Sequence, residues 1–269
     1  MPPSLRDAVV DEALSGAAVP FPDHGGLRVH PHPDQVYRPA PDPSGAPQPP
    51  GPNRFDDPHH HYPVRYFAEH LYVCLLEVMA RLRANADADA ILLHMTPGLD
   101  HRALRDLVDP TKSAEVEGFL ATNKVAVFMP PENAPVGRLV DVFNPDLLAA
   151  LDSHHRIREQ LCRREVVDAY GKDGTIHLDG SLIRNASKKV GRPVTQEISW
   201  LLIDVLHVRG LRYYSRHAEG EEAVCWALHG DVPMHILPAK SLDPTNDQHR
   251  SAVQRVADQY RLPLPARWM

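Results

Sequence analysis

The chain has 269 residues, of which 43% are hydrophobic and 24% are charged. This composition is close to that of an average folded domain, so it excludes a disordered or collagen-like chain, and the length allows one large domain or two small ones. The formal net charge of −6 speaks against binding of nucleic acid through a broad basic surface. No stretch approaches 18 apolar residues, and the start lacks the apolar run of a signal peptide. Three cysteines without a CxxC pair favour buried thiols, so we expect a cytoplasmic protein.

The first third of the chain contains two predicted strands and two predicted helices. Apolar spacing predicts a short amphipathic helix over residues 5–18, and LRVH at 27–30 is typical of a short strand. VRYF at 64–67 predicts a second strand, followed directly by a helix over 68–83. A strand that leads directly into a helix favours a mixed α/β or α+β fold.

Proline interrupts this first third. The chain has 27 prolines, and 15 of them precede residue 64. Nine lie between Arg28 and Arg54, which is too many for a helix or a central strand, so this segment predicts a long and partly extended loop.

The middle of the chain alternates between strand and helix signals. ADAILLHM at 88–95 and KVAVFM at 124–129 are typical of buried strands, and residues 101–109 predict a short helix. Residues 144–171 predict a helical stretch with Asn144 as its N-cap.

The last third is clearer. Thr195 is the predicted N-cap of a helix that Gly210 ends. Residues 211–215 and 223–230 then predict two strands joined by a short loop.

The common catalytic motifs are absent. The sequence contains no GxSxG, GxGxxG or GxxxxGK[ST], which removes support for a serine-hydrolase elbow, a Rossmann site or a P-loop. Histidines at 59–61, His70 and the pair His154 and His155 could offer imidazoles to zinc or copper. However, the HxxxH spacing that aims two helical ligands at one metal does not occur. We therefore expect no bound metal, and a hydrolytic histidine metal site is the weakest of the alternatives.

A polar set remains on elements that otherwise look like core, and its members are Arg28, Arg54, Tyr66, Glu77 and Ser215. Each has an ordinary explanation by itself. Glu77, for example, could pair with Arg81 one turn further along the predicted helix. A carboxylate among apolar residues is costly without a partner, so an arginine close to Glu77 is expected.

Taken together, the set resembles the RES-domain family, which is named for an Arg, a Glu and a Ser. Its characterised members include NAD-degrading toxins of bacterial toxin–antitoxin pairs. The resemblance rests on three blocks: LRVHP at 27–31, NRFDDPHHHYPVRYFAEHLYVCLLEV at 53–78, and TQEISWLLIDVLHVRGLRYYSRHAEGEEAVCWAL at 195–228. The order and type of these blocks are more specific than any single motif.

The resemblance implies an NAD site formed by the five polar residues, with Glu77, Arg54 and Ser215 catalytic and Arg28 and Tyr66 binding NAD. In this interpretation Glu77 stabilises the electron-poor ribose that forms when nicotinamide leaves. Arg28 and Arg54 clamp the pyrophosphate. Tyr66 offers its ring to the nicotinamide, and Ser215 orients the ribose or the amide. Tyr214 and His217 are further candidates because they flank Ser215.

The implied activity is cleavage of the nicotinamide–ribose bond of NAD. The acceptor would be phosphate, as in an NAD phosphorylase, or water, as in an NAD glycohydrolase, with NAD as substrate and no prosthetic group. An ADP-ribosyltransferase acting on a protein and a non-catalytic nucleotide-binding module are the alternatives. The implied partner is an antitoxin, which would contact DNA in place of this chain, and the oligomeric state is not readable from the sequence.

The implied fold is one mixed α/β RES domain over residues 27–240, similar to ADP-ribosyltransferases. An N-terminal extension (1–26) and a C-terminal tail (241–269) would flank it. The chain departs from the compact toxins in its enlarged, poorly aligned region 84–192 and in Asn53, where the family often has Gly. The proline-rich loop is expected to form a wall of the NAD site. These departures concern the toxin role more than the NAD site.

Overall fold

The structure is a computed structural model that describes residues 5–33, 53–59, 61–83, 110–132, 136–171, 175–184, 190–218 and 220–269. The strand predicted over 88–95, the helix predicted over 101–109 and most of the proline-rich loop lie outside the described residues.

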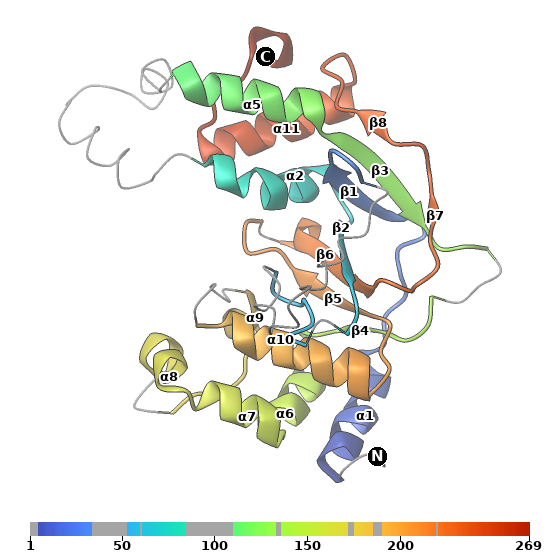
Figure 1. The fold of residues 1–269 in the computed structure, drawn as a ribbon, viewed down its shortest axis with the longest axis vertical. Coiled ribbons are helices and arrows are strands. Elements are labelled where there is room, and N and C mark those ends of the chain that lie inside the picture. The colour runs from blue at the N-terminus through green and yellow to red at the C-terminus, as the bar shows by residue number, and fades with distance from the viewer. Residues whose placement is uncertain are drawn as a thin grey trace, which may run out of the picture.

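A mixed sheet forms the centre of the molecule (Figure 1). Its strands are β1 (Gly26–His30), β2 (Val64–Ala68), β3 (Lys124–Met129), β4 (Leu139–Asp141), β5 (Gly210–Tyr214), β6 (Val224–His229), β7 (His235–Ile236) and β8 (Lys240–Ser241). The order across the sheet is β4-β5-β6-β2-β1-β3-β7, and β8 also pairs with β3. Neighbouring strands run antiparallel except β4 and β5, which are parallel.

The register of β6 brings two distant parts of the chain to one edge of the sheet. Cys225 of β6 faces Ala68, the last residue of β2, on one side and Tyr213 of β5 on the other. Because β2 and β5 both run antiparallel to β6, their carboxyl ends lie at the same edge. The helix that follows β2 and the loop that follows β5 therefore start beside each other.

Helices gather at both ends of the sheet. They are α1 (Leu5–Ala17), α2 (Leu71–Met79), α5 (Pro110–Thr122), α6 (Pro145–Ser153), α7 (His155–Leu161), α8 (Arg164–Tyr170), α9 (Gly180–Arg184), α10 (Arg192–Trp200) and α11 (Asp247–Tyr260). In Figure 1, α2, α5 and α11 lie together near the C-terminus, whereas α1, α6, α7, α9 and α10 lie toward the N-terminus. No helix within the described ranges is long and apolar enough to cross a membrane.

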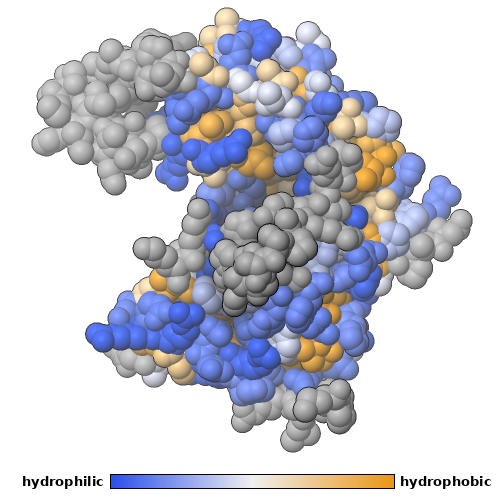
Figure 2. Space-filling model, viewed as in Figure 1, coloured by the Kyte–Doolittle hydropathy of each residue, from blue (hydrophilic) through white to orange (hydrophobic). Residues whose placement is uncertain are grey.

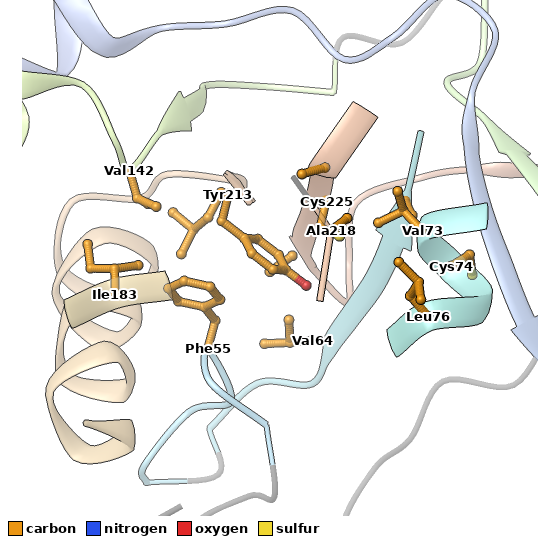
Figure 3. Close-up of a cluster of buried hydrophobic side chains, with 14 of the residues drawn as sticks. Phe55, Val64, Val73, Cys74, Leu76, Val142, Ile183, Tyr213, Ala218 and Cys225 are labelled. Carbon is orange, nitrogen blue, oxygen red and sulfur yellow. The ribbon is translucent and has the colours of Figure 1, made fainter. Parts of the chain in front are cut away.

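The main hydrophobic core lies between these helices and the sheet. Figure 3 shows the ring of Tyr213 in this core, with Phe55 and Ile183 on one side of it. On its other side lie Val73 and Leu76 of α2. The core also contains buried residues of α1 and α11. These helices belong to the two terminal segments that were predicted to flank a domain over residues 27–240.

A second, smaller core is aromatic. Phe21 contacts Trp226 edge-on at a centroid distance of 5.2 Å, and Phe67 packs on Phe128 at 4.8 Å. Trp226 is fully buried, and its indole nitrogen donates to Glu69 Oε1 at 2.9 Å. The sheet is therefore buried from both sides near its centre.

Most predicted elements in the described ranges are confirmed. The helix over 5–18 and the strands over 27–30, 64–67 and 124–129 are present as α1, β1, β2 and β3. The two strands of the last third are β5 and β6. The mixed α/β fold is thereby confirmed.

Two helix predictions were wrong in detail. The stretch 144–171 is divided into α6, α7 and α8, although Asn144 does cap α6 by accepting from the amides of Asp146 and Leu147. The helix of the last third begins at Arg192 with Gly191 as its N-cap, so Thr195 is inside it and donates to the carbonyl of Arg192.

The end of this helix also differs from the prediction. The helix widens to a π-helix over Leu201–Val205, and Gly210 starts β5 instead of ending the helix. A Cβ on Gly210 would lie 2.3 Å from a methyl of Leu228 and 2.9 Å from a methyl of Leu139. Glycine therefore lets the three strands pack closely here without displacing these leucine side chains.

Candidate active site

Glu77 and Ser215, which are 138 positions apart in the sequence, meet at the edge of the sheet described above. Ser215 follows β5, and its Oγ donates to Oε1 of Glu77 at 2.6 Å. Ser215 is fully buried, whereas the side chain of Glu77 is 30% exposed. One oxygen of the carboxylate is thus fixed from within the protein while the group stays accessible to a ligand.

Arg54 is the charged partner of Glu77. Its Nη2 lies 3.6 Å from Oε1 of Glu77, and its side chain is only 10% exposed. Nη1 donates to the carbonyl of Arg184 at 3.1 Å, and the guanidinium lies over the ring of Tyr213, 4.8 Å from its centroid. The expected arginine partner is therefore present, whereas Arg81 lies over the ring of Phe119.

Tyr66 supports the loop that carries Arg54. Its hydroxyl donates to Oδ1 of Asp56 at 2.9 Å and accepts from the amide of Phe55 at 3.1 Å. Burial, and then the negative charge of Asp56, raise the pKa of Tyr66 well above its ordinary value. Asp56 also accepts from the backbone and side-chain nitrogens of Asn53. The hydroxyl of Tyr66 is thus engaged within the protein, and only the ring remains for a ligand.

Arg28 lies on β1, beside α2. The thiol of Cys74, one turn before Glu77, donates to the carbonyl of Leu27 at 3.5 Å. Burial raises the pKa of this thiol to about 12, and the charges of Glu77 and Arg28 are both close enough to act on it. One guanidinium nitrogen of Arg28 donates to the carbonyl of Pro33 at 3.1 Å.

The loop after β5 is held from several directions. The amide of Ser215 donates to the carbonyl of Ala223 at 2.7 Å, and the amide of His217 donates to Oγ of Ser215 at 3.0 Å. Arg184 of α9 donates through Nε to the carbonyl of Ser215 at 3.0 Å and through Nη2 to the carbonyl of Ala218. The hydroxyl of Ser215 is therefore aimed at Glu77 by its neighbours.

The elements that carry these residues border a hollow in the molecular surface. Figure 2 shows the molecule hollowed between the part that contains α2 and α11 and the part that contains α9 and α10. Glu77 lies on α2, and Arg184 lies at the end of α9. A partly exposed carboxylate on an element that borders a hollow, backed by buried polar groups, is an arrangement expected of a binding or catalytic site.

Comparison with known proteins assigns the chain to a family. The sequence profile of the RES domain matches residues 27–247. The chain belongs to the RES domain family. A search of the solved structures found a chain from the crystal structure of the M. tuberculosis MbcT-MbcA toxin-antitoxin complex, with 13% identity and a TM-score of 0.42, covering 96% of this chain and 98% of that one. No curated protein matched.

Two further arginines of this RES domain lie close to Arg54. Arg192 is at the first turn of α10, and its buried Nε has no hydrogen-bond partner among the residues that the structure describes. Burial lowers the pKa of Arg192; Asp56 opposes this shift, and the positive charges of Arg216 and Arg54 add to it. Arg216 is exposed and contacts Nε2 of His217 through its Nε at 3.0 Å.

Sequence patterns did not single out Arg184, Arg192 or Arg216. Arg184 and Arg192 lie in the poorly aligned region, and their importance depends on where α9 and α10 pack. Arg216 had one usable signal, because it is adjacent to Ser215.

His59 and His61 lie near the end of α10. His59 stacks on His61 and contacts Trp200 edge-on. The buried carboxylate of Asp57 accepts from the amides of His59 and Tyr62. Within the described ranges, no group of three His, Cys, Asp or Glu residues could hold a metal ion.

Proposed function

We propose that this RES domain cleaves the bond between nicotinamide and ribose in NAD. The observation that supports the proposal best is the Glu77 carboxylate, which is partly exposed, fixed by Ser215 at 2.6 Å and paired with Arg54 at 3.6 Å. A carboxylate held in advance can stabilise a positive charge that develops on a bound sugar, without reorganising during the reaction.

The reaction breaks the C–N bond at the anomeric carbon. The bonding electron pair leaves with nicotinamide, which becomes neutral, and the ribose becomes an oxocarbenium-like cation. The carboxylate of Glu77 would stabilise this cation or bind the ribose hydroxyls. An oxygen of water or of phosphate then bonds to the anomeric carbon. Water loses its proton to the solvent, and the products are ADP-ribose or ADP-ribose 1''-phosphate.

The arginines would divide two tasks between them. Arg54 is mostly buried and is directed at Glu77 and at backbone carbonyls, which favours a role in orienting Glu77. Arg192 and Arg216 have no carboxylate bonded to them in the described part of the chain, so they are available for the phosphates of NAD. For Arg28 the proposed contact is also the pyrophosphate, and for the ring of Tyr66 it is the nicotinamide.

The test is product analysis. The purified chain is incubated with NAD, with and without phosphate, and the products are identified by mass spectrometry. We expect nicotinamide release with ADP-ribose or its 1''-phosphate as the second product, and loss of release in a folded Glu77→Gln variant. Transfer to an added protein would instead support an ADP-ribosyltransferase. NAD binding without turnover in the folded wild type would support a non-catalytic module.

The proposed biological role is that of a toxin with a cognate antitoxin in the cytoplasm, as the resemblance to NAD-degrading RES toxins implies. Inducible expression should stop growth and deplete cellular NAD. Glu77→Gln should do neither, and coexpression of the neighbouring reading frame should protect the cells. Normal growth despite measurable NAD depletion would contradict the toxin role alone.

A further inference from the structure

Helix α11 connects the two segments that bring Glu77 and Ser215 together. It begins at Asp247, where the match to the family profile ends, so the family profile does not cover it. Asn246 caps the helix, and one side of the helix is buried, including Val253, Val256 and Tyr260. The C-terminal segment is therefore a folded part of the molecule.

Three residues in the C-terminal half of α11 each contact both segments. The guanidinium of Arg255 lies over the ring of Tyr72 in α2, 3.8 Å from its centroid. The same group pairs with Glu222, in the connection between β5 and β6, at 2.7 Å.

Gln259 repeats this pattern one turn later. Its Oε1 accepts from the hydroxyl of Tyr72, and its Nε2 donates to the carbonyl of His217. Its amide group thus links α2 directly to the loop that carries Ser215.

Tyr260 is the buried member of the three and lies closest to the site. Its hydroxyl donates to the carbonyl of Leu76, the residue before Glu77, at 3.0 Å. Its ring contacts the ring of His217 nearly perpendicularly, at a centroid distance of 5.9 Å. Tyr260 therefore contacts the neighbours of both Glu77 and Ser215.

We propose that Tyr260 is a positioning residue, which sets the distance between the Glu77 carboxylate and the Ser215 hydroxyl through its contacts with Leu76 and His217. The inference rests on the proposed NAD cleavage only for its effect on rate. A single hydrogen bond between Glu77 and Ser215 cannot by itself fix two separate segments. A displacement of about 1 Å in a catalytic group can cost on the order of 100-fold in rate.

The kinetic test compares three variants on the same helix. We expect Tyr260→Ala to lower kcat about 50-fold and to leave KM for NAD within about twofold. Tyr260→Phe keeps the ring contact with His217 but loses the hydrogen bond to the Leu76 carbonyl, so its kcat should fall between those of Tyr260→Ala and the wild type. Gln254→Ala is the matched control, because Gln254 donates to the carbonyls of Trp268 and Met269, away from the site. It should leave kcat unchanged.

Hydrogen exchange tests the positioning without an activity assay. The amides of Ser215 and His217 donate to the Ala223 carbonyl and to Ser215 Oγ, so both should be protected in the wild type. Tyr260→Ala should speed their exchange while β3 stays protected, and Gln254→Ala should not.

The outcomes separate the two proposals. If the wild type does not cleave NAD but Tyr260→Ala still shows the local change in exchange, the proposed NAD cleavage is overturned and the positioning role stands. Wild-type kcat together with wild-type exchange in Tyr260→Ala would overturn the positioning role. An equal loss of kcat in Gln254→Ala and Tyr260→Ala would also overturn the positioning role. It would show that any change in α11 lowers the rate by disturbing the fold.

Discussion

Ser215 contributes to the site through Glu77, because its only hydroxyl proton is donated to that carboxylate. Its Oγ also accepts from the amide of His217 and is fully buried, so the hydroxyl has little capacity left for a substrate. The name-giving serine of this RES domain is thus placed to orient the name-giving glutamate. This arrangement leads to a kinetic prediction.

Replacing Ser215 with Ala should lower kcat about 10- to 100-fold and change KM for NAD little, because Glu77 loses the group that orients it but keeps its charge. Steady-state kinetics with NAD measure this. Thr should retain more activity than Ala if its hydroxyl fits the buried position. A tenfold rise in KM at constant kcat would show instead that Ser215 binds the substrate directly.

Arg192 and Arg216 should act on the phosphates of the substrate. Arg192→Gln and Arg216→Gln should each raise KM for NAD about tenfold, since a charged hydrogen bond to phosphate is worth about 1.5–3 kcal/mol. Both variants should cleave nicotinamide riboside, which lacks phosphates, at the wild-type rate. Arg250→Gln is the control, because Arg250 pairs with Asp247 on the surface of α11. Equal losses on NAD and on the riboside would contradict a phosphate role.

At the scale of elements, the strands were predicted well because their apolar runs are intrinsic to the sequence, as in KVAVFM of β3. The short strands β4, β7 and β8 have two or three residues each, which is too few to show any periodicity. The start of α10 was misplaced because Thr195 is a good capping residue in isolation. Pro193, which suits a first helical turn, was the better signal.

Helix α1 should couple stability to pH through His154, which lies between α6 and α7. Its Nε2 contacts Oδ1 of Asp7 at 3.0 Å, and its buried Nδ1 has no hydrogen-bond partner within the described ranges. Burial lowers the pKa of His154, although Asp7 opposes the shift. In the unfolded chain His154 has the ordinary pKa of about 6.5, so the unfolded state binds the proton more readily. The free energy of unfolding should therefore fall as the pH drops below about 6.5.

Urea denaturation at pH 7.5 and 5.5 checks this coupling. His154→Gln should lose less stability than the wild type between the two pH values. The exposed His24 offers a control, and His24→Gln should lose as much as the wild type. Parallel losses in His154→Gln and the wild type would show that His154 does not contribute.

At the scale of the whole molecule, the sequence identified residues far apart in the chain that do meet, namely Arg54, Glu77 and Ser215. The resemblance to the RES-domain family made this possible, because no local pattern relates Glu77 to Ser215, which are 138 positions apart. Arg184 and Tyr260 could not be predicted in the same way. Their contacts are to backbone carbonyls, which any sequence provides, so only the packing of α9 and α11 determines them.

The shared core predicts that the terminal segments unfold together with the sheet. Leu14 of α1 and Val253 of α11 are fully buried in the same hydrophobic core as the residues around the site. Leu14→Ala should lower the free energy of unfolding by about 3 kcal/mol, whereas Val9→Ala, at an exposed position of α1, should change it by less than about 0.5 kcal/mol. Tryptophan fluorescence reports on Trp200 of α10, Trp226 in the sheet and Trp268 near the C-terminus, and circular dichroism reports on the helices. In urea, both signals should shift together in Leu14→Ala. Separate transitions would instead favour independent units divided near residues 26 and 240.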